Sequence, residues 1–422
     1  MRYGRGTLQV EIPDQNLAGV LTVQQSAPLA DAEQSIWEAL ESPIDSAPLS
    51  ELAANRTSAC VVISDVTRPV PNQLILPPIL QTLELQRIPR EKITILIATG
   101  IHRPNEGKEL EEMVGCDILN TYRIVNHLAL EPQTHKYLGL TRNGTPVHID
   151  KTYLESDLKI TTSLIEPHLM AGYSGGRKAV CPGLVSVETI KTMHGPKILE
   201  HPKASVGVMA DNPFHIEATE IALMAGVDFS VNVAIDSRRS LTGVFAGDLV
   251  KAHLAGAKFV EKQVKATLPR PVDAVVVSGA GYPLDATFYQ GIKGVLAAAE
   301  IVKPDGSIIL VAECSQGIGS ESFTDLILKT QDLEQFVQGI FNSANFIIDQ
   351  WQLEELAKAV RKAAIYCYAG GIPHNQMENL FVRPVATLEE GIELILSKHG
   401  SDAKIAAIPD GPYVLATVEK MS

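Results

Sequence analysis

Positive charge is scarce in this sequence of 422 residues. It contains 36 lysine and arginine residues against 49 aspartate and glutamate residues, which gives a formal net charge of −13. Nucleic acids and anionic membrane surfaces attract proteins through clustered basic side chains, so we expect neither as a partner. A small anionic substrate stays possible, because the local charge of a binding site can oppose the net charge of the chain.

Long apolar runs are also lacking. The opening residues MRYGRGTLQVEIP contain no apolar segment of a signal peptide, and no later stretch approaches the roughly 18 uninterrupted apolar residues of a membrane span. We therefore expect a soluble, cytoplasmic protein. Cysteine is sparse, odd in number and without C-x-x-C spacing, which favours reduced and mostly buried thiols. The five cysteines are Cys60, Cys116, Cys181, Cys314 and Cys367.

Apolar material is plentiful, because hydrophobic residues make up 45% of the chain. Short apolar runs alternate with amphipathic helical patterns, which predicts two α/β domains with mainly parallel sheets. A proline-flanked linker before a new apolar run places the domain boundary near residue 268. The expected strands cover 59–64, 92–98, 158–165, 272–278, 307–313 and 404–409, and helices are expected at 288–302 and 353–363.

Ligands of open α/β sheets bind beyond the carboxyl ends of the strands, so the turns after the expected strands are the candidate site. The first, SDVTRPVP, contains Asp65, Thr67 and Arg68. Aspartate and threonine are ordinary turn and cap residues. A guanidinium just before two prolines is less easily explained by turn formation, and it suits bidentate binding of a carboxylate or phosphate.

The second turn, ATGIHRP, places His102 two residues after a glycine. A lone histidine is more often structural than catalytic. A structural role explains His102 less well, because this residue follows an expected strand closely, as Asp65, Thr67 and Arg68 do in the first turn.

The third turn lies in IEPHLMAGYSGGRKAVCPGL, where a strand ends at His168 and a glycine-rich segment follows. Gly172, Gly175 and Gly176 would let backbone N–H groups approach an anion, and Lys178 could reach back toward it. The pattern is neither G-x-x-x-x-G-K-[ST] nor G-x-G-x-x-G. A nucleoside triphosphate or a standard dinucleotide is therefore not indicated.

Histidines also occur in MHGPKILEHP, as His194 and His201, where each stands beside glycine or proline. Histidines in tight turns are candidate metal ligands. H-E-x-x-H and the usual cysteine spacings are absent, so a zinc site built from protein ligands alone is weakly supported.

A further turn, GYPLDATFYQGIKG, places Tyr289, Gln290 and Lys293 at helical spacing near a helix start, where they could share one face. A solvated first turn would explain Gln290 and Lys293 equally well. Trp351 is one of only two tryptophans, and such a residue is more often part of a core than a ligand contact.

Taken together, DVTRPVP, TGIHRP, EPHLMAGYSGGRKAVCPG, MHGPKILEHP and DATFYQGIKG resemble the lactate racemase family, the nickel-pincer-nucleotide enzymes. The motifs occur in this order between about residues 60 and 295, and Trp351 extends the likeness further along the chain. Each motif alone has little specificity, but the combination is specific.

The resemblance implies a cofactor derived from nicotinic acid mononucleotide, pyridinium-3,5-bisthiocarboxylic acid mononucleotide, which binds nickel through sulfur, carbon and sulfur. Lys178 matches the lysine that is covalently joined to this cofactor, and His194 matches the histidine that completes the nickel coordination. His102 and His168 match the two histidines that act as acid and base. Two such groups suit a racemase, because a proton must be handled on either face of the substrate.

The remaining candidate residues follow from the same resemblance. Residues 1–268 would form the N-terminal domain that binds the cofactor and carries the catalytic histidines, and residues 269–422 would form a C-terminal domain that closes over the substrate across a cleft. The expected cofactor or substrate contacts are Asp65, Thr67, Arg68, Gly172, Gly175 and Gly176 in the first domain, and Tyr289, Gln290, Lys293 and Trp351 in the second.

The function implied is inversion at C2 of a lactate-type 2-hydroxy acid, by hydride transfer to the nickel-pincer nucleotide and back through a 2-keto acid. Proteins of cofactor biosynthesis would be partners. The same constellation would serve malate, aromatic 2-hydroxy acids or a sugar acid. Two functions of other classes stay open from the residues alone, namely a zinc hydrolase using His102, His168 and His194, and a nucleotide-binding carrier without catalysis.

Overall fold

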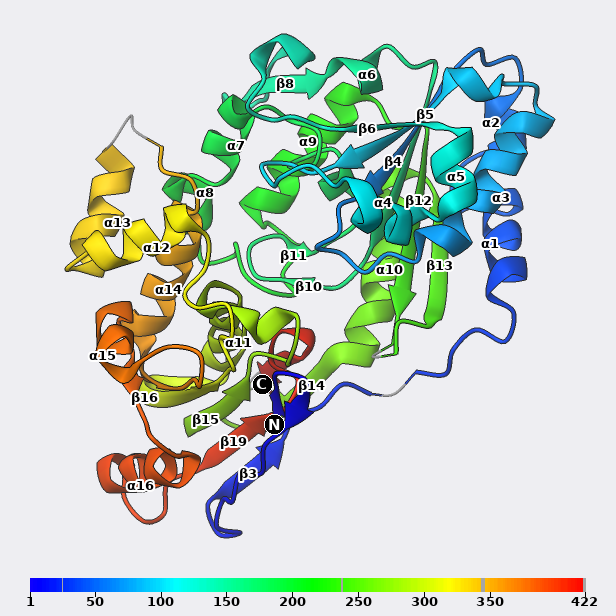
Figure 1. The fold of residues 1–422 in the computed structure, drawn as a ribbon. Helices are drawn as coiled ribbons and strands as arrows, with labels where there is room; N and C mark the ends of the chain where they lie inside the picture. The colour runs from blue at the N-terminus through cyan, green and yellow to red at the C-terminus, as the bar shows by residue number, and fades with distance from the viewer. Residues whose placement is uncertain (25, 237, 343–345, 420–422) are drawn as a thin grey trace. The chain divides into compact units, whose positions relative to one another are not determined.

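A computed structural model describes residues 1–24, 26–236, 238–342 and 346–419 of the chain (Figure 1). The chain forms two compact units. The central unit comprises Gln25–His194 and Lys203–Lys262, and the terminal unit comprises Met1–Gln24, Gly195–Pro202 and Gln263–Ser422. The last crossing between the units thus lies five residues before the predicted boundary at 268, whereas residues 1–24 and 195–202 pack with the later part of the chain.

The central unit is built on a six-stranded sheet of order β13-β12-β9-β4-β5-β6. β13 runs antiparallel to β12, and the other neighbours are parallel. The strands are β4 (Ala59–Ser64), β5 (Ile93–Ala98), β6 (Arg123–Asn126), β9 (Leu158–Leu164), β12 (Phe229–Ile235) and β13 (Leu241–Gly247). Three of these strands occur at the predicted positions, because unbroken apolar runs of this length suit strands that are buried on both faces.

Helices cover this sheet because their apolar stripes pack against its buried residues. Ile36 and Leu40 of α1 join Ile75 and Ile79 of α3 in one core with the strands. The helices are α1 (Ala32–Glu41), α2 (Leu49–Ala53), α3 (Asn72–Leu85), α4 (Gly107–Val114), α5 (Cys116–Thr121), α6 (Lys151–Leu154), α7 (Val187–Met193), α9 (Pro213–Ala225) and α10 (Leu249–Val264). Two antiparallel pairs lie outside the main sheet, β7 (His135–Leu140) with β8 (Pro146–Asp150) and β10 (Pro167–His168) with β11 (Gly172–Tyr173).

The terminal unit has a second six-stranded sheet, of order β18-β17-β16-β15-β19-β3, in which all neighbours are parallel. Its strands are β3 (Leu17–Val20), β15 (Val272–Ser278), β16 (Val302–Val311), β17 (Ala363–Tyr368), β18 (Arg383–Pro384) and β19 (Ile405–Ile408). Its helices include α8 (Pro196–Leu199), α11 (Phe288–Ala299), α12 (Glu321–Lys329), α13 (Leu333–Asn342), α14 (Gln350–Lys362), α15 (His374–Met377) and α16 (Leu388–His399). Two short pairs complete it, β1 (Arg2–Tyr3) with β2 (Gly6–Thr7) and β14 (Lys265–Leu268) with β20 (Leu415–Val418).

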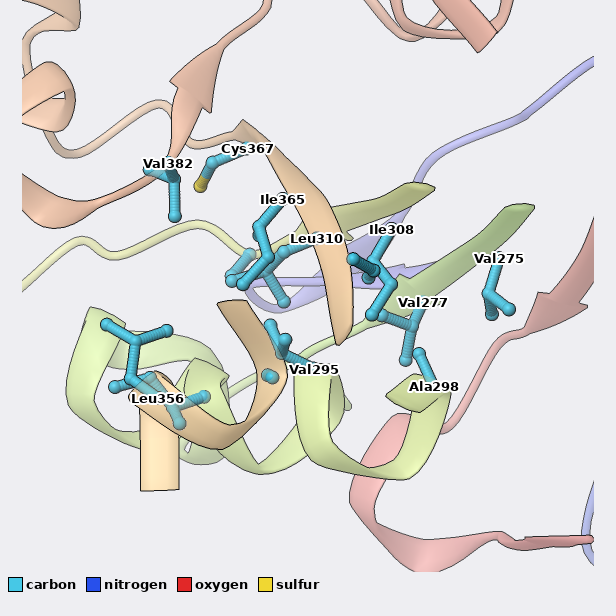
Figure 2. Packing of buried hydrophobic residues seen from close by; sticks show 14 of the residues in the cluster. Val275, Val277, Val295, Ala298, Ile308, Leu310, Leu356, Ile365, Cys367 and Val382 are labelled. Carbon is cyan, nitrogen blue, oxygen red and sulfur yellow. The ribbon is translucent and has the colours of Figure 1, made fainter. Parts of the chain in front are cut away.

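Figure 2 shows the core on one face of this sheet, where α11 and α14 pack on the strands. Val277 and Leu310 of the sheet lie against Val295 of α11 and Leu356 of α14, and all four side chains are fully buried. At about 1.5–3 kcal/mol for each buried aliphatic side chain, this face contributes much of the unit's stability. The opposite face has its own core, with α16.

One strand is longer than the sequence pattern predicts. β16 begins at Val302 rather than at residue 307, because Val302 pairs with Val272 before a register shift. Because the residues directly after Val302 are polar, the sequence pattern does not predict this part of the strand. The structure confirms two α/β units with mainly parallel sheets, and all five cysteines are free thiols, of which four are buried. Within the described ranges, no helix is both long and apolar enough to cross a bilayer.

Candidate active site

The turns after β4, β5 and β9 meet at one edge of the central unit's sheet, because these three strands are adjacent and parallel. Asp65 organises the first of these turns. Its side chain is buried, Oγ1 of Thr67 donates to its Oδ1 at 2.6 Å, and its backbone carbonyl accepts the N–H of Arg68 at 3.1 Å. The turn is therefore held by its own aspartate, and Arg68 projects from a fixed backbone.

His102 is joined to this aspartate across the sheet edge. Its Nδ1 lies 2.6 Å from Oδ2 of Asp65, while the His102 side chain itself is 53% exposed. Burial alone would raise the pKa of Asp65, but the contacts with His102, Thr67 and Arg68 together lower it below its ordinary value. An ionised carboxylate at Nδ1 favours a proton on that nitrogen, which leaves Nε2 as the basic atom.

His168 has the opposite arrangement. It lies on β10, and its Nδ1 accepts the backbone N–H groups of Met170 and Ala171, each at 3.3 Å. An Nδ1 that accepts hydrogen bonds carries no proton, so the neutral ring holds its proton on Nε2. The two histidines are thus fixed in different tautomers by their surroundings.

Arg68 faces a second acidic residue that the sequence analysis did not single out. Its Nε lies 3.4 Å from Oε1 of Glu166, and the two side chains are 26% and 24% exposed. Glu166 stands two residues before His168, in the same turn as that histidine.

The three glycines of the third turn have positive φ angles and fit against other parts of the protein. A Cβ on Gly172 would lie 2.3 Å from the carbonyl oxygen of Val208, and one on Gly176 would lie 2.7 Å from the ring of His253. The N–H of Gly176 donates to Asn232 at 2.8 Å. Close internal packing therefore explains the need for glycine here, and contact of these residues, Gly175 included, with a cofactor stays a prediction.

Arg177 stiffens the same turn from inside. Its guanidinium is buried and donates to the backbone carbonyls of Ala171 (2.6 Å) and Gly175 (3.3 Å), and it also contacts His253. Burial lowers the pKa of Arg177 to about 9, which still leaves it charged near neutral pH. Since Arg177 points inward, its neighbour Lys178 emerges from a rigid support.

Lys178 and His194 meet on one aromatic ring. Nζ of Lys178 lies 4.8 Å from the ring centroid of Phe214, and the ring of His194 stands edge-on to the same phenyl group at 5.4 Å. Phe214 is fully buried at the start of α9, where the side chain of Asn212 accepts its N–H at 2.9 Å. Asn212 also donates to the carbonyl of Met170, which ties α9 to the turn containing His168.

His194 directly follows α7 and is only partly exposed. Burial lowers its pKa to about 3, and the nearby charges of Lys178 and His102 act in the same direction. The ring is therefore neutral at physiological pH. Neutral imidazole is the form that binds a metal ion.

The predicted substrate contacts of the terminal unit form a second group on α11 and α14. Nε1 of Trp351 donates to the hydroxyl of Tyr289 at 3.2 Å, and that hydroxyl lies 3.2 Å from Oδ1 of Asp349. Oε1 of Gln290 is buried and has no hydrogen-bond partner among the described residues. Lys293 follows Gln290 by one turn of α11 and is partly exposed.

The structure also bears on the alternative of a zinc site. Across the residues described, no three side chains from histidine, cysteine, aspartate and glutamate are grouped so as to hold a metal ion. His102, His168 and His194 thus do not form a ligand set by themselves.

Solved and curated proteins resemble the whole chain. The structure of the lactate racemase apoprotein from Thermoanaerobacterium thermosaccharolyticum matches with a TM-score of 0.93 and 32% identity over 99% of both chains. A Thermotoga maritima protein of known structure, 17% identical with a TM-score of 0.69, shares the fold. Curated lactate racemases from T. thermosaccharolyticum (32% identity, 98% of this chain and 97% of the relative) and Lactiplantibacillus plantarum (34%, 98% of both) also match. These relatives make the protein an isomerase, specifically a racemase.

Family models narrow the assignment further. The lactate racemase N-terminal domain matches residues 3–207, and the lactate racemase C-terminal domain matches residues 268–416. The chain belongs to the lactate racemase family. The resemblance seen in the sequence motifs is thereby confirmed, and hydrolase and non-catalytic carrier functions are set aside.

Proposed function

We propose that this protein inverts C2 of a lactate-type 2-hydroxy acid with the help of a nickel-pincer nucleotide. The observation that carries the proposal is the grouping of the chemical side chains in the central unit. His194 is electrostatically coupled to both Lys178 and His102, and it shares the ring of Phe214 with Lys178. These side chains, together with His168, are groups that the chemistry requires, and all of them belong to the central unit.

The residues fit the cofactor in their chemistry. Lys178 supplies the amine for covalent attachment, and neutral His194 supplies one nitrogen ligand of a type that nickel accepts. The cofactor's own sulfur and carbon atoms would provide the other ligands, so a single protein ligand suffices. When bound, the nickel-pincer nucleotide supplies reversible hydride transfer at C2 of the substrate.

Arg68 would hold the substrate carboxylate, because its guanidinium is oriented by Thr67 and stands beside both histidine-bearing turns. Asp65 and Thr67 would act with it as cofactor or substrate contacts, as predicted from the resemblance. In the first instance Asp65 serves His102, since both of its oxygens already accept hydrogen bonds.

His102 and His168 would handle the hydroxyl proton on the two faces of the substrate. With Nδ1 of His102 protonated beside Asp65, Nε2 of His102 can remove this proton while the C2 hydride leaves and the C–O bond becomes a carbonyl. When hydride returns to the other face of the planar keto acid, Nε2–H of His168 would donate a hydrogen bond and then its proton to the developing alkoxide, while solvent replaces that proton on the ring so that no imidazolate remains. The imidazolium of His102 would return its proton to solvent. Reversal of the roles gives the opposite enantiomer.

Tyr289, Gln290, Lys293 and Trp351 would contact the substrate from the terminal unit. The buried amide oxygen of Gln290 supports this role, because such an atom gains a partner when a hydroxyl group binds. We propose that residues 269–422 act as the domain that closes over the substrate and that residues 1–268 bind the cofactor. Proteins that build the cofactor would be the partners, and a larger 2-hydroxy acid remains the second candidate substrate.

The test combines metal analysis, intact mass and a chiral assay on protein produced with and without the cofactor-biosynthesis proteins. We expect nickel and a covalent mass increase only with those proteins, together with racemisation of lactate. In D₂O, hydride return should invert C2 without solvent deuterium at that carbon. Stoichiometric deuterium at C2 of the inverted product would show proton abstraction instead and would overturn the mechanism.

A further inference from the structure

The carboxylate of Glu166 pairs with the guanidinium of Arg68, which the proposed function assigns to the substrate carboxylate. Nε of Arg68 lies 3.4 Å from Oε1 of Glu166, and the Arg68 guanidinium is also held by the carbonyl oxygen of Thr67 at 3.2 Å. The side chains of Arg68 and Glu166 are each about three-quarters buried. An ion pair in this setting is screened less than one at the open surface.

The backbone of Glu166 is locked in place. Its N–H donates to Oγ of Ser174 at 2.9 Å, and its carbonyl accepts the N–H of Ser174 at 2.9 Å. This pair of bonds continues the β10 and β11 hairpin, in which His168 pairs with Gly172. The backbone of Glu166 therefore stays in place beside Arg68, and only rotation of its side chain could move the carboxylate away.

Arg68 already faces two negative groups, because the buried carboxylate of Asp65 also interacts with it electrostatically. A substrate with one carboxylate adds one further negative charge that Arg68 can share through its remaining N–H groups. A substrate with two carboxylates adds a second negative charge to a site that already holds Asp65 and Glu166. Like charges a few ångströms apart repel strongly in a partly desolvated site.

We propose that Glu166 is a specificity-determining residue that restricts this site to 2-hydroxy acids with a single carboxylate. The proposal rests on the proposed function, since it takes Arg68 as the group that binds the substrate carboxylate. Selection by repulsion is a common means of specificity, because it rejects the wrong ligand without tightening the grip on the right one.

The test compares lactate with malate, which differs by one added carboxylate, on holoenzyme carrying Glu166→Gln. The variant keeps the shape of the side chain and removes its charge. We expect the ratio of kcat/KM for malate to that for lactate to rise on the order of tenfold, as removal of one nearby like charge predicts. Wild-type discrimination should weaken as salt is added, whereas that of the variant should stay nearly constant.

Two further variants serve as controls for this experiment. Glu112→Gln removes another glutamate of the central unit that pairs with a base, Lys108, at a similar 3.6 Å, and it should leave the ratio unchanged. Glu166→Asp keeps the charge one methylene further back and should retain most of the preference for lactate. An unchanged ratio in Glu166→Gln, or an equal rise in Glu112→Gln, would overturn the proposal.

A binding measurement separates this proposal from the proposed function. If wild-type holoenzyme racemises neither acid, the proposed function fails, and the shift in Tm produced by each acid decides the role of Glu166. Malate should then stabilise Glu166→Gln more than wild type, while lactate stabilises both alike. The absence of any difference between the two proteins with malate would refute the role of Glu166. The Tm without ligand reports whether the variant folds.

Discussion

Nδ1 of His102 lies 2.6 Å from Oδ2 of Asp65, in a pair whose aspartate is buried and whose histidine is half exposed. The aspartate thus acts in the first instance as a positioning residue for His102. It fixes which nitrogen of His102 carries the proton, and its charge stabilises the imidazolium that forms when His102 takes up a proton.

Asp65→Asn should lower kcat about 10–100-fold, the usual effect of losing such a supporting partner. Covalent cofactor content, measured by intact mass, should stay near the wild-type level. A purely structural role of Asp65 would instead lower cofactor content or Tm together with kcat.

His194→Ala should abolish nickel retention while the fold is preserved, since the imidazole is the protein's proposed metal ligand and is only partly buried. Metal analysis and circular dichroism provide the two readouts. His201→Ala, which removes an exposed histidine seven residues along the chain, is the matched control and should retain nickel. Full nickel occupancy in His194→Ala would contradict the assignment.

His102→Ala and His168→Ala should each remove racemisation but leave the cofactor bound. Each histidine would serve one face of the substrate, so the two variants should differ in which enantiomer still yields the keto acid in a single turnover. Rapid-quench analysis of D- and L-lactate with each variant would detect this. Near-normal racemisation by either variant would rule out the two-histidine mechanism.

Phe214→Leu should reduce cofactor loading, and this loss should be larger than the variant's small effect on the free energy of unfolding can explain. The substitution removes the ring shared by Lys178 and His194 but keeps an apolar side chain, so we expect a stability cost of about 1–2 kcal/mol. Phe229→Leu, at another fully buried phenylalanine of the same unit, should cost a similar amount and leave loading unchanged. Equal loading in the two variants would mean that Phe214 is only a core residue.

Raising the pH should destabilise the terminal unit through Glu354. Burial and the neighbouring carboxylate of Glu355 raise the pKa of Glu354 to about 8, against the lowering effect of Lys358. From about its ordinary value of 4.5 up to 8, the unfolded chain releases this proton while the folded chain keeps it, so stability falls as pH rises.

Glu354→Gln should therefore be more stable than wild type at pH 9, by about 1–3 kcal/mol once structural relaxation is allowed for. At pH 5 the two proteins should differ little. Thermal unfolding across this pH range provides the measurement, with Glu321→Gln as a control at an exposed position. A Glu354→Gln variant whose Tm falls with pH as steeply as that of wild type would contradict the prediction.

Six of the twelve strands in the two main sheets could be predicted, because each is a short, nearly unbroken apolar run, as in β4 and β15. The turns that follow them could be located for the same reason, since parallel strands end at a common edge. Phe214 could not be found this way. It lies far along the chain from Lys178 and looks like an ordinary apolar residue at a helix start, and only the Asn212-Pro cap before it hints at a fixed position.

Glu166 shows a second reason why the site could not be predicted fully from the sequence. A glutamate beside a proline and a histidine has no distinctive pattern, and its meaning comes from Arg68, which is brought to it by a different strand. The sequence predicts anion binding by the glycines of the third turn, but it does not reveal that a Cβ on Gly172 or Gly176 would clash with Val208 or His253 inside the protein. Sequence spacing predicts which residues share a turn, but not which side of the turn packs inward.

The pairing of β3 with β19 has a consequence for how the chain is made. Leu17 and Ile405 are partners in the same sheet, although they stand far apart in the sequence. The central unit can fold as soon as its own residues have emerged. The edge strand β3 of the terminal unit must wait until β19 has been made, so completion of that sheet requires the closure of a very long loop.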